Sequence, residues 1–196
     1  MAVSSSQEAP RPLRADARRN REAVLRAARE AFESDGVLTS LDGVAARAGV
    51  GNATLYRHFP TRDDLLAAVM ATSTTEALGV ADELAGSRSP RAALSAWLEL
   101  LSWRLRIWHD LPYCLASAHA DPGSPVTSAC NPLQQRTATL LAAAQASGDV
   151  RRDVDADQVY ELVLALSWAT DRFHHDEPTA RRRVATATAG LFTAPD

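Results

Sequence analysis

Apolar residues recur at helical spacing along almost the whole chain, and this periodicity limits the possible folds more than any other feature. Val24, Leu25, Ala28 and Phe32, for example, share one face of a helix expected over residues 16–34. Beyond residue 71 no stretch alternates apolar and polar residues, as a half-buried strand would, and no Asn-Gly hairpin signal occurs. The sequence therefore predicts an all-α protein with about nine helices.

The composition narrows the class of protein further. The chain has 196 residues, of which 46% are hydrophobic and 23% are charged, as in a soluble protein with a hydrophobic core. No apolar run approaches the roughly 20 residues that cross a bilayer, and the first ten residues lack the apolar segment of a signal peptide. Two cysteines, Cys114 and Cys130, cannot form a disulfide scaffold. We therefore expect a cytoplasmic protein.

Charge is distributed unevenly, although the net charge of the whole chain is −3. All 21 cationic residues are arginines, and residues 11–29 hold seven of them against two acids. Residues 71–196 are acidic overall. A basic segment at one end indicates a surface that meets a polyanion, although a solvated basic helix would give the same pattern.

Two short helices joined by a tight turn follow the first helix. The earlier one is expected to start at Thr39, with Asp42 completing a variant of the capping box, and its free N–H groups could hold a phosphate. Gly49 can adopt the positive φ of the turn. The second helix runs over residues 52–59 and ends before Pro60. This is a helix-turn-helix, whose second helix enters the major groove of DNA.

The run Thr54-Leu55-Tyr56-Arg57-His58-Phe59-Pro60-Thr61-Arg62 resembles the signature of the tetracycline-repressor (TetR) family of transcriptional regulators. The resemblance covers about residues 16–70, and the rest of the chain agrees with the family in length and helical character. It implies a DNA-binding domain of three helices, followed by a helical domain that binds a ligand and dimerises. We expect a flexible basic arm over residues 1–13, the DNA-binding domain over 14–60 and the regulatory domain over 61–196.

The resemblance also implies particular DNA contacts. Thr54, Tyr56 and His58 would touch mainly the DNA backbone, and Arg62 would bind a phosphate. Asn52, in the groove, is able to form a bidentate pair, preferably with adenine. The full set of expected contacts is Arg14, Arg18, Thr39, Gly51, Asn52, Ala53, Thr54, Tyr56, Arg57, His58 and Arg62.

Alternatives to these contacts stay open at this point. Tyr56 and His58 could simply place their polar tips at a helix surface. Asn52 and Asp42 stand where the family often has a basic residue, which removes positive charge near the DNA. Arginines of the N-terminal segment could compensate by reaching the backbone or the minor groove, or they could be disordered; they are Arg14, Arg18 and Arg19.

The C-terminal half offers candidates for a dimer surface and a ligand pocket. Apolar residues of two expected helices, over residues 156–174 and 178–192, would pair with a second copy: Val159, Leu162, Val163, Leu166, Val184, Thr188 and Leu191. Aromatic and neighbouring residues would line a pocket for an apolar or aromatic ligand: Trp97, Leu101, Trp103, Trp108, Tyr113, Cys114 and Trp168. Tryptophans at helical spacing could equally belong to the core.

The sequence thus predicts a homodimeric transcriptional repressor that a small molecule releases from a palindromic operator. The rival hypothesis is a helical small-molecule or metal sensor without specific DNA binding. No metal site, cofactor or enzymatic activity is expected, because neither a metal-ligand spacing nor a catalytic motif such as GxSxG is present in the sequence.

Overall fold

The computed structural model describes residues 11–193 and confirms the all-α prediction. Within this range nine α-helices precede one short 3-10 turn, η1 (Ala189–Leu191). The helices are α1 (Arg11–Asp35), α2 (Leu41–Ala48), α3 (Asn52–His58), α4 (Arg62–Ser87), α5 (Pro90–Arg104), α6 (Leu111–His119), α7 (Pro125–Ala146), α8 (Ala156–Arg172) and α9 (Glu177–Thr188). None of the described helices combines the length and the apolar character that crossing a membrane would need.

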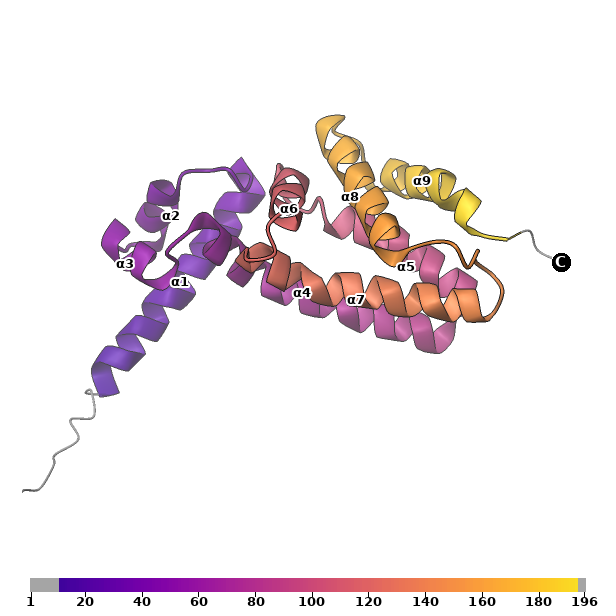
Figure 1. The fold of residues 1–196 in the computed structure, drawn as a ribbon. Coiled ribbons are helices and arrows are strands. Elements are labelled where there is room, and N and C mark those ends of the chain that lie inside the picture. Colours follow the sequence, from indigo (N-terminus) through magenta and orange to yellow (C-terminus); the bar gives the residue numbers. More distant parts are fainter. Residues whose placement is uncertain (1–10, 194–196) are drawn as a thin grey trace, which may run out of the picture.

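The helices form a small head and a longer body, as Figure 1 shows. The head consists of α1, α2 and α3, and α1 packs against both of the shorter helices. The body consists of α4 to α9, in which α4 lies along α7 and α5 packs against α4, α7, α8 and α9. Helix α4 follows α3 in the chain and also packs against α1, so α4 connects the body to the head both along the chain and in space.

Local signals explain how the head folds. Leu55 and Phe59 of the α3 segment are buried among α1 and α2 residues such as Phe32 and Val44. Gly49 ends α2 with a φ of 68°, as the predicted tight turn requires. The N-cap of α2 is Ser40 rather than the predicted Thr39, because the Ser40 hydroxyl accepts the Gly43 N–H at 3.4 Å.

Several helices begin with residue types that favour helix starts. Thr61 caps α4 through a capping box, in which its hydroxyl accepts the Asp64 N–H at 3.1 Å and the Asp64 carboxylate accepts the Thr61 N–H at 2.9 Å. Ser89 caps α5, and Pro90 is the first helical residue.

Other helix bounds differ from the prediction. Helix α1 already begins at Arg11, so residues 11–13 are helical, whereas residues 1–10 of the expected arm lie outside the described part of the chain. Helix α7 is continuous through Pro132, although a proline inside a helix usually kinks or breaks it. Helix α5 ends at Arg104, and residues 105–110 form a separate turn that leads into α6.

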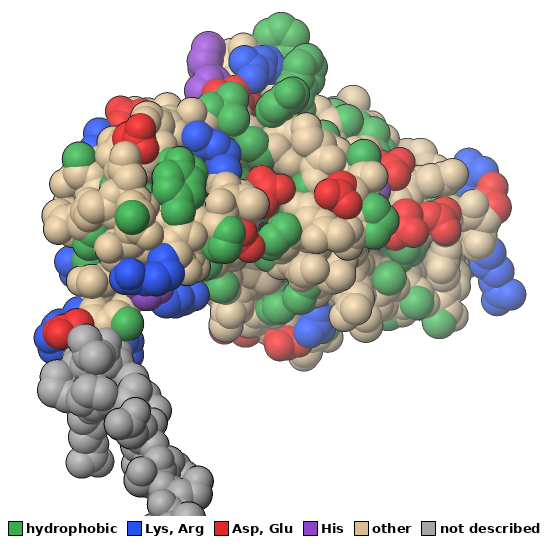
Figure 2. Space-filling view, turned by 60° about the vertical axis from the view of Figure 1, so that its left-hand side comes forward, with side chains coloured by type: hydrophobic (Ala, Val, Ile, Leu, Met, Phe, Trp, Pro, Cys, Tyr) green, Lys and Arg blue, Asp and Glu red, His purple; other side chains and the backbone are tan. Residues whose placement is uncertain are grey.

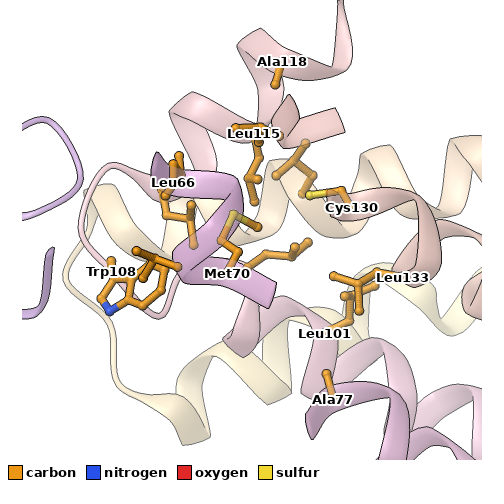
Figure 3. Packing of buried hydrophobic residues seen from close by; sticks show 14 of the residues in the cluster. Leu66, Met70, Ala77, Leu101, Trp108, Leu115, Ala118, Cys130 and Leu133 are labelled. Carbon is orange, nitrogen blue, oxygen red and sulfur yellow. The ribbon is translucent and has the colours of Figure 1, made fainter. Parts of the chain in front are cut away.

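The body is filled by side chains from α4, α5, α6 and α7, many of which Figure 3 shows. Trp97 is fully buried there, and its indole N–H donates to the Thr137 hydroxyl at 2.9 Å. Burial raises the pKa of the Cys130 thiol to about 11. This thiol therefore stays protonated at neutral pH, as expected of a structural cysteine.

The capping box of α4 yields a test of the fold. We predict that Thr61→Ala lowers the free energy of unfolding by about 1 kcal/mol, because the first turn of α4 loses its cap. Urea unfolding followed by circular dichroism measures the change. Thr72→Ala, at an exposed position inside α4, should cause no loss, and equal losses in the two variants would contradict the role of the cap.

Candidate nucleic-acid interface

One face of α3 is free of contacts with the rest of the head. Asn52, Ala53, Tyr56 and Arg57 are exposed, and the Tyr56 side chain is the largest apolar group on this face, with 45% of its surface accessible. Gly51, the residue before α3, is exposed as well. Because Leu55 and Phe59 anchor the opposite side in the core, the outer face has a fixed orientation. It presents an amide, a phenol and a guanidinium, which can bond to base edges and phosphates.

Other residues that were predicted to contact DNA occupy positions that are less accessible to it. Thr39 and Thr54 are half-buried. The His58 Nε2 atom is buried and has no hydrogen-bond partner among the described residues. Arg62 donates from Nη1 to the Val37 carbonyl at 2.7 Å, so at least one of its donors is engaged inside the protein rather than offered to a phosphate. The side chain of Arg14 lies outside the described residues.

Arg21 of α1 lies at the end of α3, and Arg18 is exposed one turn earlier on α1. The guanidinium of Arg21 sits 5.3 Å from the centre of the Phe59 ring, and Arg18 forms only a long, exposed pair with Glu22 at 3.7 Å. Figure 2 shows arginine side chains gathered on the head, beside a histidine. Arg21 was not among the predicted contacts, because helical periodicity along α1 does not reveal that this residue reaches the end of α3.

The head is held to the body by the turn over residues 105–110. The Val37 N–H donates to the His109 carbonyl at 3.0 Å, and the Phe32 and Trp108 rings meet edge-on with centroids 5.7 Å apart. Within the body, the start of α7 is joined to that of α4, since the Ser124 hydroxyl donates to the Asp63 carboxylate at 2.9 Å. The position of the head therefore depends on the conformation of this turn.

A buried carboxylate from α8 holds the same turn in place. Asp171 has only 1% of its side chain accessible and accepts the Asp110 N–H and the His109 Nδ1–H, each at 3.1 Å. The Arg106 guanidinium lies 3.6 Å from the Asp171 carboxylate, and Arg172 pairs with the Asp110 carboxylate. His109, Asp110 and Asp171 are close enough together to hold a metal ion. Because two arginines already balance the two carboxylates, the geometry instead supports a structural link.

The seven predicted pocket residues do not line one cavity. Trp97 and Leu101 are fully buried in the core, and Trp108 borders a small cavity of only about 20 Å³, which has room for no more than a water molecule. Trp103 is half-buried against the Arg106 guanidinium, and Cys114 is half-buried on α6. Two of the seven, Tyr113 and Trp168, share a surface groove between α6 and α8 of about 390 Å³. The seven side chains therefore do not form one site in this structure, because Trp97, Leu101 and Trp108 pack the core.

The dimer-surface prediction also needs correction. Within a single chain, Val159, Val163, Val184 and Thr188 are at most 2% exposed, so they cannot contact a second copy. Leu162, Leu166 and Leu191 are half-buried. An exposed apolar side chain next to α9 is instead that of Phe173, with 64% of its surface accessible.

Comparison with known proteins places this arrangement in a class of helical DNA-binding regulators. Residues 24–69 match the family model for bacterial regulatory proteins of the tetR family. Residues 89–193 match the model for the C-terminal domain of SbtR-like transcriptional regulators. A search of functionally curated proteins gave no match.

Solved structures agree with the family models. A TetR transcription regulatory protein from Mycobacterium vanbaalenii is 32% identical, with 93% of this chain and all of that chain covered and a TM-score of 0.52. A TetR transcriptional regulator from Streptomyces coelicolor is 26% identical, covering 89% of this chain and 99% of that one, with a TM-score of 0.56. A TetR-family regulator from Pectobacterium atrosepticum, 20% identical over 93% of this chain and 99% of that one, shares the fold with a TM-score of 0.66.

The chain therefore belongs to the TetR family of transcriptional regulators, which bind DNA. The family resemblance of the helix-turn-helix run is confirmed. The head corresponds to the matched N-terminal domain, although that match extends to residue 69 and so includes the first turns of α4.

The contact between head and body provides a second test. Gly36 has a φ of 80°, and a Cβ atom there would lie 3.1 Å from the His109 carbonyl oxygen, whereas Gly49, with a φ of 68°, has open space around it. We predict that Gly49→Ala costs about 1–2 kcal/mol of unfolding free energy from backbone strain alone. Gly36→Ala should cost more, because it also crowds the His109 carbonyl.

Chemical denaturation of the two glycine variants, side by side, gives this comparison. Gly51→Ala, at a φ of −74° with open space around it, serves as the control without strain. Equal destabilisation by Gly36→Ala and Gly49→Ala would show that the turn at His109 does not press on the head in solution.

Proposed function

We propose that this protein is a homodimeric repressor that binds an inverted-repeat operator through α3 and releases it when a small molecule binds the body. The observation that carries the proposal is the exposed outer face of α3. This face is anchored from behind by Leu55 and Phe59, and Arg21 of α1 lies over the Phe59 ring at the end of the helix. A recognition helix needs this combination, because its base contacts must be presented at a fixed orientation while nearby cations bind phosphates.

Individual roles follow from exposure and chemistry. Asn52, at the exposed start of α3, can pair with adenine through two hydrogen bonds. Tyr56 and Arg57 face outward one turn later and suit the DNA backbone, and Arg18 and Arg21 supply further positive charge. Gly51 and Ala53 allow close approach to the groove because they carry little or no side chain. Thr39, Thr54, His58 and Arg62 remain proposed neighbours of the DNA with secondary roles.

A second copy would cover the outer surface of α8 and α9. A groove on this surface is lined by Leu166, Ala169 and Phe173 of the α8 end and by residues of α9 such as Arg183 and Ala187. At the top of Figure 2, hydrophobic, basic and histidine side chains protrude together at the α8 end of the body. Pairing of the two helices from each copy would bury this apolar surface in a two-fold interface. Half-sites of the operator would then lie about 34–36 Å apart, one turn of DNA, or a multiple of this spacing.

Substitutions on α3 separate base recognition from backbone binding. We predict that Asn52→Ala weakens binding by about 1–3 kcal/mol and relaxes preference at one base pair per half-site. Tyr56→Phe should instead weaken binding to all duplexes similarly, because the lost hydroxyl serves the backbone. Fluorescence-anisotropy titrations use the duplex that the unmodified protein binds best, together with its single-base variants. An unchanged base preference in Asn52→Ala would exclude direct readout by this residue.

The dimer surface can be tested without disturbing the core. Ala187 is exposed on α9, so we predict that Ala187→Glu leaves the fold intact but shifts the protein from dimer to monomer by placing like charges at the two-fold interface. Sedimentation velocity measures the shift, and circular dichroism checks the helix content. Ala142→Glu, at an exposed position of α7, is the matched control. If Ala187→Glu remains a dimer to the same extent as Ala142→Glu, the dimer interface does not include this surface of α9.

A further inference from the structure

A groove between α6 and α8 has the form of a small-molecule site. Its volume is about 390 Å³, and its walls include Pro112, Tyr113, His119, Glu161, Leu164 and Trp168. Sites for small organic ligands are typically about 300–1,000 Å³, mostly apolar, with a few polar groups. The cavity near Trp108, at about 20 Å³, is far too small for such a ligand.

Two aromatic side chains of this groove are unusually exposed. Tyr113 and Trp168 have 53% and 46% of their surfaces accessible, although both come from helices that otherwise pack in the body. Large aromatic groups gain by leaving water, so two of them on the walls of one groove favour a ligand with a flat apolar surface. Their electron-rich faces also attract cations.

The polar end of the groove is a fixed carboxylate. The Gln134 amide donates to His119 Nδ1 at 3.1 Å, so His119 Nε2–H is the group that donates to the Glu161 carboxylate at 3.2 Å. This chain of hydrogen bonds orients Glu161 and uses one of its oxygens. Glu161 is the one acidic side chain among the groove-lining residues, which include neither lysine nor arginine and all lie in the described part of the chain. The groove thus has an excess of negative charge.

We propose that the α6–α8 groove binds a planar aromatic cation, whose ring lies against Trp168 and Tyr113 and whose positive charge pairs with Glu161. This assignment rests on the proposed function, because it supplies the chemical class of the small molecule that regulates DNA binding. The groove lies on a different part of α8 from the proposed dimer surface, which involves Leu166, Ala169 and Phe173. Each copy in a dimer would therefore have its own binding site.

The experiment compares three probes of similar shape and different charge. They are 9-aminoacridine, a cation at pH 7.5, neutral acridine, and the anion acridine-9-carboxylate. Isothermal titration calorimetry with the full chain, in the absence of DNA, measures their affinities. We expect the cation to bind about tenfold more tightly than acridine, since an exposed ion pair and a cation–π contact each contribute modestly. The anion should bind more weakly than either.

Two variants assign the binding to the groove. Glu161→Gln should remove the preference for 9-aminoacridine over acridine, and Trp168→Ala should weaken both probes. Glu99→Gln, which alters a carboxylate paired with Arg181 in a separate groove between α4 and α5, is the matched control and should change neither affinity. Thermal unfolding checks that all three variants fold.

Several outcomes would overturn the assignment. The first is equal affinity for 9-aminoacridine and acridine. The second is no binding of any probe at millimolar concentration. The third is a preference for 9-aminoacridine over acridine that persists in Glu161→Gln. Binding to monomeric Ala187→Glu but not to the dimer would also overturn it, because a second copy would then cover the groove. Operator binding is measured separately, so a protein that binds its operator but none of the probes refutes this site and leaves the proposed function standing. Binding of the cation without any preferred duplex would instead refute the function.

Discussion

The position of α3 depends on the burial of Leu55 and Phe59 in the head. These two side chains occupy one side of a helix of only seven residues, which would not be stable alone. Packing against α1 and α2 therefore both forms the helix and orients it, so that Asn52, Tyr56 and Arg57 face outward. The position of Arg21 depends on the same packing, because its guanidinium lies over the Phe59 ring.

The contact between head and body links this surface to the rest of the molecule. The turn over residues 105–110 contacts the head through His109 and Trp108. Asp171 of α8, in the body, holds the same turn through hydrogen bonds to His109 and Asp110. A buried carboxylate with this many partners is costly to leave unpaired, so the turn has one well-defined conformation while the cluster is intact. Helix α6 follows directly, and the groove that we assign to the ligand lies between α6 and α8. A ligand that moves α6 against α8 would therefore act next to the turn that positions the head.

The sequence predicted those parts of the fold that local chemistry determines. The capping box at Thr61, the Ser89-Pro90 start of α5 and the glycine turn at Gly49 all have short-range causes, and each is present. The end of α5 is not marked in the sequence, because apolar residues continue at helical spacing through Trp108, whose side chain instead packs on Phe32 of the head. Ser40 and Thr39 are both competent caps, so the sequence alone could not choose between them.

The candidate site was predictable where it follows a motif and unpredictable where it depends on tertiary neighbours. The exposed face of α3 follows from the helix-turn-helix pattern. In contrast, the bond from Arg62 to the Val37 carbonyl joins residues far apart in sequence. Apolar periodicity likewise cannot say whether Val163 or Val184 faces its own chain or a second copy, and both prove to be buried within one chain.

Selection of bound duplexes from a random DNA pool, followed by sequencing, tests the central claim most directly. A dimer that reads DNA through the outer face of α3 should enrich an inverted repeat, with half-sites centred about one helical turn or a multiple of it apart. A pool that stays unenriched even at low salt, where phosphate contacts are strongest, would contradict sequence-specific recognition by this protein.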